Sequence, residues 1–383
     1  MSISMALPHK TRWRHRERLL QELLGPAGVS VNGSRSFDIS IRNDSFYTRA
    51  LPRGPSGLLD AYVEGWWDTG QLDELTCRVL ARHPKLSKTG RFLGSFRRLV
   101  PLLFNRQSLG RAGQVRRHYD LGNDLFTAML DRRLVYSCAY WQGAADLDQA
   151  QEAKLELIAR KLNLRPGMRV LDIGCGWGSF LQYAAETRGV SGVGITLSKD
   201  QYDLGRTMCR GLPIELRVQD YREFSGGPFD AVVSIGMFEH VGYKNYRAFM
   251  QAVRRHLKPE GLLLLHTIGS NVSRIDVDEW IDRNIFPAGM LPSARQVSEA
   301  AEGLFVLEDW HNFGADYDRT LMAWFENFQR NWYRLREKYG ERFYRKWKCY
   351  LLTCAGAFRA RDMQLWQIVF SPSGVRGGYA SVR

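Results

Sequence analysis

The stretch VLDIGCGWGSF, residues 170–180, decides the fold of this chain. Its apolar start predicts a buried strand, and glycines then occupy three of five positions: Gly174, Gly176 and Gly178. Glycines between a strand and a helix leave room for a ligand to touch backbone N–H groups. The G-x-G-x-G spacing differs from the G-x-G-x-x-G of dinucleotide folds, and the preceding Asp172 is typical of S-adenosylmethionine (SAM) methyltransferases. A simple tight turn is the alternative interpretation.

Outward from this stretch, apolar segments alternate with helix-length segments. The apolar segments are residues 168–174, 191–196, 214–220, 229–236 and 261–269. This alternation predicts an α/β fold of the Rossmann-like methyltransferase type, with a parallel sheet covered by helices on both faces. Polar residues follow the second and third segments: Thr196, Ser198, Gln201, Gln219, Asp220 and Tyr221. The acid that usually binds ribose after the second strand is missing, since hydroxyl groups stand there.

Composition predicts a globular protein. The 383 residues are 44% hydrophobic and 25% charged, which suits two or three domains with a large core. No run approaches the roughly 20 apolar residues of a membrane span, and the N-terminus lacks the apolar core of a secretion signal. A cytoplasmic location is therefore expected. The six cysteines show no CxxC pair and no zinc spacing, so we expect reduced thiols and no metal.

Turn residues and shifts in composition along the chain predict three parts. Residues 1–84 form a small mixed domain, with a helix over 14–28, two short strands joined by an Asn-Gly turn within 29–43, and an apolar helix over 56–69. Residues 85–110 form a basic linker, and residues 111–383 form the methyltransferase-type domain. The last hundred residues are expected to be helical and aromatic-rich.

The net charge of +14 is unevenly placed. Residues 75–119 contain no Asp or Glu but eleven basic residues: Arg78, Arg82, Lys85, Lys88, Arg91, Arg97, Arg98, Arg106, Arg111, Arg116 and Arg117. Such a cluster suits nucleic acid or anionic lipid, and a solvated linker is the plain alternative. Apolar residues interleaved over 92–104 could lie in a membrane interface or pack on a neighbouring domain.

Three further residues are candidates for the site. Glu239 follows the fourth predicted strand, and His266 stands where the fifth ends, at the edge where such sheets bind ligands. The alternatives are a surface acid and a hydrogen-bonded core histidine. Cys354 is a candidate nucleophile, although a small residue beside the pocket is the simpler interpretation.

Six segments carry a resemblance to the cyclopropane fatty acid synthase family: VLDIGCGWGSF, GITLSKDQ, SIGMFEHVGYKNY, LLHTIGS, YDLGNDLF and YSCAYW. It runs from GWWD near Trp66 to CAGAFRARDMQLWQIVFS near Cys354, and is closer to the phospholipid-acting members with an extra N-terminal domain than to the shorter mycolic acid members. The resemblance implies transfer of a methylene carbon from SAM to a cis double bond of an unsaturated acyl chain in a membrane phospholipid.

The same resemblance implies partners and a location. The partners are the phospholipid bilayer and its anionic surface, with no nucleic acid, and a homodimer is left open. The implied location is the cytoplasm, peripherally associated with the inner face of the cell membrane. An alkene that attacks a sulfonium methyl group becomes a carbocation, which needs a dry cavity, nearby π faces and a base. Aromatic candidates are Tyr140, Trp141, Phe238, Trp324, Phe328 and Trp332, the last three at a helical spacing for which ordinary core is the favoured alternative.

Site residues follow from the resemblance. It implies that bound bicarbonate removes the proton and is held by Cys138, Glu239, His266, Tyr317 and the backbone of Ile268, while Cys354 matches a residue that the family counts as catalytic. The expected SAM site comprises Tyr136, Ser137, Asp172, Gly174, Cys175, Gly176, Gly178, Thr196, Leu197, Ser198, Gln201, Gln219, Asp220 and Tyr221.

Two other classes of protein remain as alternatives. A SAM-dependent RNA methyltransferase would also be basic, but its catalytic cysteine usually sits in a Pro-Cys motif after the fourth strand, where this chain has GMFEH. A lipid-binding scaffold could lose the glycine-rich loop and its acid, whereas this chain keeps both.

Overall fold

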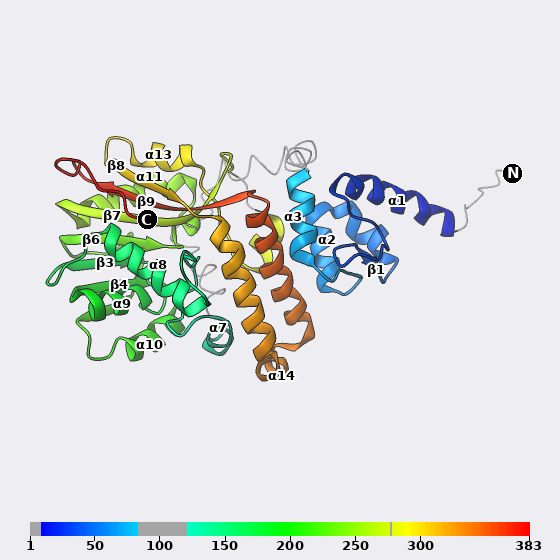
Figure 1. The fold of residues 1–383 in the computed structure, drawn as a ribbon, viewed down its shortest axis with the longest axis horizontal. Helices are drawn as coiled ribbons and strands as arrows, with labels where there is room; N and C mark the ends of the chain where they lie inside the picture. Colours follow the sequence, from blue (N-terminus) through cyan, green and yellow to red (C-terminus); the bar gives the residue numbers. More distant parts are fainter. Residues whose placement is uncertain (1–8, 83–120, 276–277) are drawn as a thin grey trace. The chain divides into compact units, whose positions relative to one another are not determined.

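The computed structural model describes residues 9–82, 121–275 and 278–383, which fall into two compact units (Figure 1). Of the described residues, 9–82 and 332–362 form the N-terminal unit. The sheet unit comprises the described residues 121–275, 278–331 and 363–383 and contains the glycine-rich stretch. Within the described ranges, no helix combines the length and the apolar character needed to cross a membrane.

The sheet unit is built on seven strands in the order β5-β4-β3-β6-β7-β9-β8. They are β3 (Arg169–Ile173), β4 (Ser191–Thr196), β5 (Ile214–Val218), β6 (Phe229–Ile235), β7 (Leu257–Ser270), β8 (Val306–Asn312) and β9 (Met363–Ser371). Pairs among β3 to β7 are parallel, and β9 runs antiparallel to both β7 and β8. The strand order reverses at β3, between β4 and β6, and such sheets bind ligands at the carboxyl ends of the strands beside this switch.

Helices connect these strands and cover the sheet. They are α7 (Asn123–Met129), α8 (Leu147–Lys161), α9 (Ser179–Arg188), α10 (Lys199–Met208), α11 (Tyr246–His256), α12 (Glu279–Asn284), α13 (Ala294–Ala301) and the first part of α14 (Ala315–Arg359). Two short helical turns follow β6, namely η5 (Phe238–His240) and η6 (Tyr243–Asn245).

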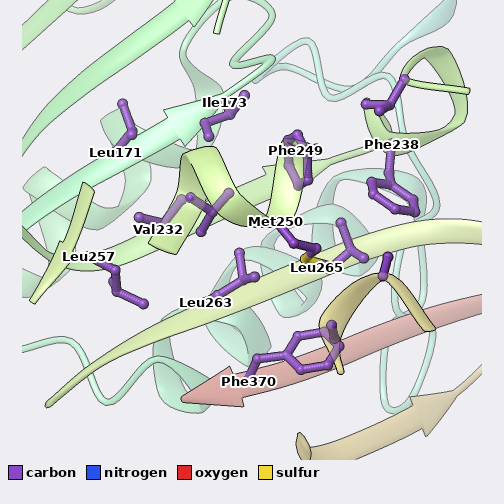
Figure 2. Packing of buried hydrophobic residues seen from close by; sticks show 14 of the residues in the cluster. Leu171, Ile173, Val232, Phe238, Phe249, Met250, Leu257, Leu263, Leu265 and Phe370 are labelled. Atoms are coloured by element: carbon purple, nitrogen blue, oxygen red, sulfur yellow. The ribbon is translucent and has the colours of Figure 1, made fainter. Parts of the chain in front are cut away.

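The two faces of the sheet are both buried. Figure 2 shows one face, where Leu171, Val232 and Leu263 of the strands pack against Phe249 and Met250 of α11. The neighbouring strand residues Val170, Val233 and Leu264 point to the other face. They pack against Leu155 of α8 and Phe180 of α9. Burial on both faces explains why these strands are continuous apolar runs in the sequence.

The predicted Rossmann-like fold and its five strands are confirmed, with two corrections. The sheet is mixed rather than wholly parallel, because β9 is inserted antiparallel between β7 and β8. The expectation that the last hundred residues are helical is wrong for β8 and β9. The whole of residues 364–371 is buried in the sheet, so its apolar run is a core strand.

The N-terminal unit contains mainly short elements. They are α1 (His9–Leu24), η1 (Gly25–Ala27), β1 (Ser40–Ile41), η2 (Phe46–Ala50), η3 (Leu51–Arg53), α2 (Gly54–Val63), β2 (Trp67–Asp68) and α3 (Leu72–Arg82). The predicted hairpin within 29–43 is wrong, since β1 pairs with β2 and Val31 makes only an isolated bridge with Ile39. The Asp38 carboxylate accepts the backbone N–H groups of Ser30 (2.8 Å) and Arg35 (2.9 Å), and these bonds replace a strand ladder.

The later part of α14 belongs with this unit. Arg345 donates to the carbonyl of Tyr62 (2.8 Å) and pairs with Asp68 (3.3 Å). The predicted boundaries of 1–84, 85–110 and 111–383 leave this helical segment in the last domain, whereas contacts group residues 332–362 with the N-terminal unit. The predicted linker lies outside the described residues and stays a prediction.

Candidate functional site

The glycine-rich loop joins β3 to α9 and opens onto a cavity. Gly174 has φ 85°, and a Cβ there would lie 2.7 Å from Cβ of Met237, so a side chain has no room. Gly176 has φ 57°, and the nearest atom to its missing Cβ is Nε2 of Gln201 at 3.9 Å. Only glycine fits at position 174, because the backbone there lies close to Met237. Gly176 instead leaves open space on the cavity side of the loop.

The cavity lies at the carboxyl ends of β3, β4 and β6. Every residue of the SAM site predicted from the sequence lines it except Gly178. Gly178 instead precedes α9 with φ 81°, and a Cβ there would lie 3.1 Å from Sγ of Cys209. The lining residues that sequence reasoning missed include Lys154, Trp177, Arg222, Met237 and His240.

Polar groups after β4 and β5 are held in place by local hydrogen bonds. Thr196 donates to Oε1 of Gln201 (3.0 Å), and Ser198 caps α10 by accepting from the Gln201 backbone (3.3 Å). Burial alone would raise the pKa of Asp220, but hydrogen bonds from Arg222 lower it, so this carboxylate is charged. Hydroxyl and amide groups thus stand after β4 where a ribose-binding acid is usual, as the sequence indicates.

Asp172 and Lys154 place a buried acid and a buried base on the cavity wall. Asp172 is buried, its Oδ1 has no hydrogen-bond partner among the described residues, and burial raises its pKa to about 7 although Lys154 opposes the shift. Lys154 is fully buried and donates to Oγ of Ser137 (2.9 Å). Its position among Leu155, Ile158 and other apolar residues of α8 is the sequence signal that could have identified it.

Glu239 and Ile268 are in contact at the carboxyl ends of β6 and β7. Glu239 lies in η5, directly after β6, and its Oε1 accepts the backbone N–H of Ile268 at 2.6 Å. Its Oε2 is buried and has no hydrogen-bond partner within the part of the chain that the structure describes. Burial raises the pKa of Glu239 to about 7, and the bond from Ile268 opposes this. The group is therefore poised between acid and carboxylate near neutral pH.

His266 lies two residues before Ile268 on β7. It is 1% exposed, and burial holds its pKa well below the usual value, so the imidazole is neutral. Nε2 of Gln367 lies 3.3 Å from Nδ1 of His266. The other ring nitrogen of His266, Nε2, is buried and has no hydrogen-bond partner among the described residues.

Cys138 and Tyr317 are both associated with α14. Sγ of Cys138 lies 4.0 Å from Oγ1 of Thr320, one turn after Tyr317, and burial raises the pKa of this thiol. The Tyr317 ring contacts Trp324 edge-on at 5.9 Å. Cys354 belongs to the N-terminal unit, and its role stays a prediction.

The candidate aromatic residues have several roles. Trp324 is buried and packs on Tyr136, which lines the cavity (5.1 Å between ring centroids). Phe328 is buried, and Trp332 belongs to the N-terminal unit, so the helical stripe is not one surface of this site. The other candidates are fixed by neighbours: Phe238 stacks on Tyr246, Trp141 donates to Thr320, and Tyr140 contacts Phe313.

Comparison with known proteins identifies the family. The model for "Mycolic acid cyclopropane synthetase" matches residues 107–368. The chain belongs to this family. It is 50% identical over 367 residues to cyclopropane-fatty-acyl-phospholipid synthase of Escherichia coli K12, covering 96% of each chain. Cyclopropane mycolic acid synthase 2 of Mycobacterium bovis is 35% identical over 66% of this chain and 92% of its own.

Solved structures of cyclopropane synthases share the fold. The cyclopropane synthase MmaA2 from Mycobacterium tuberculosis is 33% identical, with a TM-score of 0.64 over 68% of this chain and 97% of its own. The mycolic acid cyclopropane synthase CmaA1, solved with SAH and CTAB, gives a TM-score of 0.63 at the same identity and coverage. SAH is the product that SAM leaves after donating its methyl carbon, so this relative binds the cofactor class expected here.

Proposed function

We propose that this chain transfers a methylene carbon from SAM to the cis double bond of an unsaturated acyl chain in a membrane phospholipid, which forms a cyclopropane ring. SAM-dependent cyclopropane synthesis is the activity of the family, and the 50% identity with the phospholipid-acting E. coli enzyme extends over 96% of both chains. The observation that carries the proposal is the adjacency of the cavity and the acid: Gly236, Met237 and His240 line the cavity, and Glu239 lies between them.

The cavity has the features that SAM requires. Gly176 leaves its backbone accessible, and Asp172 offers an unpartnered buried oxygen to a cationic ligand. The hydrogen-bond donors and acceptors after β4 and β5 suit the ribose hydroxyls and the polar edge of adenine, while the apolar wall suits the adenine face. These residues would bind and orient SAM.

The chemistry needs a dry site and a proton acceptor. The alkene electrons form a bond to the methyl carbon of SAM, the C–S bond breaks, and its electrons stay on sulfur. The resulting cation must lose one proton from the transferred carbon before the ring closes. Trp324 and Tyr136 offer π faces beside the cavity, which stabilise a cation.

Bicarbonate is the proposed proton acceptor. Glu239 Oε2 and His266 Nε2 are both buried polar atoms without a hydrogen-bond partner among the described residues, which suits a small anion that accepts and donates. Protonated Glu239 would donate to the anion, His266 would donate from Nε2, and Cys138 and Tyr317 complete the proposed holders. Bound bicarbonate would accept the proton, so none of these side chains needs to act as the base.

The remaining parts of the proposal concern the membrane. The phospholipid substrate requires access to the bilayer, so we place the protein in the cytoplasm, peripherally associated with the inner face of the membrane. The anionic surface would be met by the basic run, meaning the eleven basic residues of 75–119, most of which lie outside the described residues. A homodimer and a catalytic contribution of Cys354 complete the proposal.

Lipid mass analysis of cells expressing the protein tests this function. We expect unsaturated phospholipid acyl chains to be replaced by species one CH2 heavier. The Glu239→Gln variant, expressed at an equal level, serves as the control and should give little product. Lipids unchanged relative to cells without the protein would refute the proposed activity.

A further inference from the structure

Three polar side chains lie in register across strands β7, β9 and β8. His266 on β7 is the Cα partner of Gln367 on β9, and Gln367 is in turn the partner of His311 on β8. Residues paired in this way project from the same face of a sheet, so the three side chains form one row. Gln367 is the middle member of this row.

Gln367 is buried at a position whose neighbours are apolar. It is 0% exposed, and the residues two places away on β9, Leu365 and Val369, are buried as well. An amide taken out of water costs free energy unless its polar atoms find partners. Nε2 of Gln367 lies 3.3 Å from Nδ1 of His266, while Oε1 is buried and has no partner among the described residues. Within the described residues, the contact with His266 is therefore what compensates for the burial of this amide.

The imidazole of His266 has one proton, which can sit on either ring nitrogen. Burial and the positive charges of Lys154 and Lys161 hold the pKa of His266 well below its usual value, so the ring is neutral. In a neutral histidine, the hydrogen bond made by one nitrogen decides whether the other carries the proton. The group opposite Nδ1 therefore determines whether Nε2 offers a donor or an acceptor to a ligand.

The other neighbours of this row do not compete for Gln367. Nδ1 of His311 lies 3.1 Å from Nζ of Lys161, so His311 has a polar partner of its own on α8. The Phe313 ring contacts the rings of both His266 and His311, with centroid distances of 6.0 and 4.9 Å, but it has no polar atom. Among these neighbours of His266, only Gln367 can hydrogen-bond to Nδ1.

A neutral imidazole can donate to an anion only through its single N–H group. We propose that Gln367 is a positioning residue for the bicarbonate site: its amide nitrogen donates to Nδ1 of His266, which keeps the imidazole proton on Nε2, where it can donate to the bound anion. The inference rests on the bicarbonate site proposed above. Gln367 does not line the cavity, so it acts through His266.

Nitrogen-15 NMR of the histidine rings tests the tautomer directly, because protonated and unprotonated ring nitrogens resonate at different frequencies. The full-length protein is labelled on its eight histidines, and the signals of His266 are assigned by their absence from the spectrum of His266→Ala. For wild type near pH 7 we expect a protonated Nε2 and an unprotonated Nδ1 in His266. A proton on Nδ1 would overturn the proposal.

Gln367→Met removes the donor and keeps a side chain of similar length. The bicarbonate concentration that gives half the maximal rate of cyclopropane formation should rise about 3- to 10-fold, which is the loss expected for one hydrogen bond. The KM for SAM should be unchanged, because Gln367 does not line the cavity. His266 should now show a mixture of both tautomers. A folded Gln367→Met protein with the bicarbonate dependence of wild type would contradict the proposed role.

Gln364 supplies a matched control. It is also a buried glutamine on β9, but it accepts from Nδ2 of Asn312 (3.1 Å), and its partner on β7 is Gly269 rather than His266. Gln364→Met should keep the wild-type tautomer and bicarbonate dependence, and thermal unfolding of both variants checks their folds. The same change of bicarbonate dependence in both variants would indicate a general loss of packing and overturn the specific role of Gln367.

If Gln367→Met fails to fold, the tautomer of the wild-type protein still decides. If the wild-type rate does not depend on bicarbonate, the proposed proton acceptor is refuted instead. The NMR spectrum then shows separately whether Gln367 holds the proton of His266 on Nε2, so the two failures are distinguishable.

Discussion

Glu239 accepts the backbone N–H of Ile268 at 2.6 Å, which joins the helical turn after β6 to the end of β7. His266, two residues earlier on β7, accepts the N–H of Gly236 through its carbonyl at 2.9 Å. These bonds fix a buried acid and a neutral imidazole at one edge of the sheet, beside the cavity wall formed by Gly236 and Met237.

Gly176→Val should abolish SAM binding. The side chain would project into open space on the cavity side, and φ 57° disfavours a β-branched residue. The measurement is SAM titration by calorimetry. Gly167→Val is the control, because Gly167 also has positive φ (83°) and open space but does not line the cavity. Equal SAM affinity in Gly176→Val and wild type would show that the loop is not the cofactor site.

Glu239→Gln should stabilise the protein at pH 8 but not at pH 4.5. The folded state raises the pKa of Glu239 from 4.5 to about 7, so it holds a proton that the unfolded chain has lost. Wild-type stability therefore falls as pH rises from 4.5 to 7, by about 3 kcal/mol for this group. Gln mimics the protonated acid and still accepts from Ile268, so it avoids the loss. Denaturant unfolding in buffer free of carbon dioxide measures the difference, and a pH-independent difference would contradict the raised pKa.

Glu239→Gln and His266→Ala should lower the rate of cyclopropane formation by about 10² to 10³ with SAM affinity nearly intact, since each removes a preorganised group. The wild-type rate should also fall in buffer stripped of carbon dioxide and recover when bicarbonate is added. His256→Ala is a control, because this buried histidine bonds to the Gly226 carbonyl and does not line the cavity. If the rate does not depend on bicarbonate and Glu239→Gln is fully active, bound bicarbonate is not the base, and another side chain must accept the proton.

The glycine-rich loop and five strands could be predicted because their signals are local. A strand that is buried on both faces is a continuous apolar run, which can be recognised in the sequence. Asp172 and the glycines after it mark the edge of the sheet where the cavity lies. Glu239 and His266 could be placed at that edge because parallel strands end together.

Other features depend on long-range contacts that no local pattern carries. Lys154 stands among apolar residues of α8, which indicates a buried position, but only the fold reveals its contact with Ser137. The apolar run of β9 follows a helical segment, and its partner β8 is largely polar, so the local sequence pattern predicts neither strand. Gly356 packs where a Cβ would lie 2.3 Å from the Asp73 carbonyl, which shows that α14 returns to the N-terminal unit.

Membrane binding by the basic run should depend on its charge. Replacing Arg97, Arg98, Arg116 and Arg117 by Gln should weaken binding to anionic vesicles, since each contributes on the order of 1 kcal/mol near the surface, while SAM affinity is unchanged. These residues lie outside the described part of the chain. The control replaces four exposed residues of the sheet unit, with the same loss of charge: Lys199, Arg210, Arg255 and Arg295. Equal vesicle binding in both variants would remove the membrane role of the basic run.

The most direct measurement of the proposed activity uses SAM with a trideuterated methyl group. The purified protein is incubated with this SAM and vesicles of unsaturated phospholipid, and the acyl chains are analysed by mass spectrometry. Because one proton must leave the transferred carbon before the ring closes, we predict a product that retains two of the three deuterium atoms and has lost its double bond. A product that retains all three deuterium atoms as a methyl branch, or the absence of any labelled acyl chain, would contradict the account.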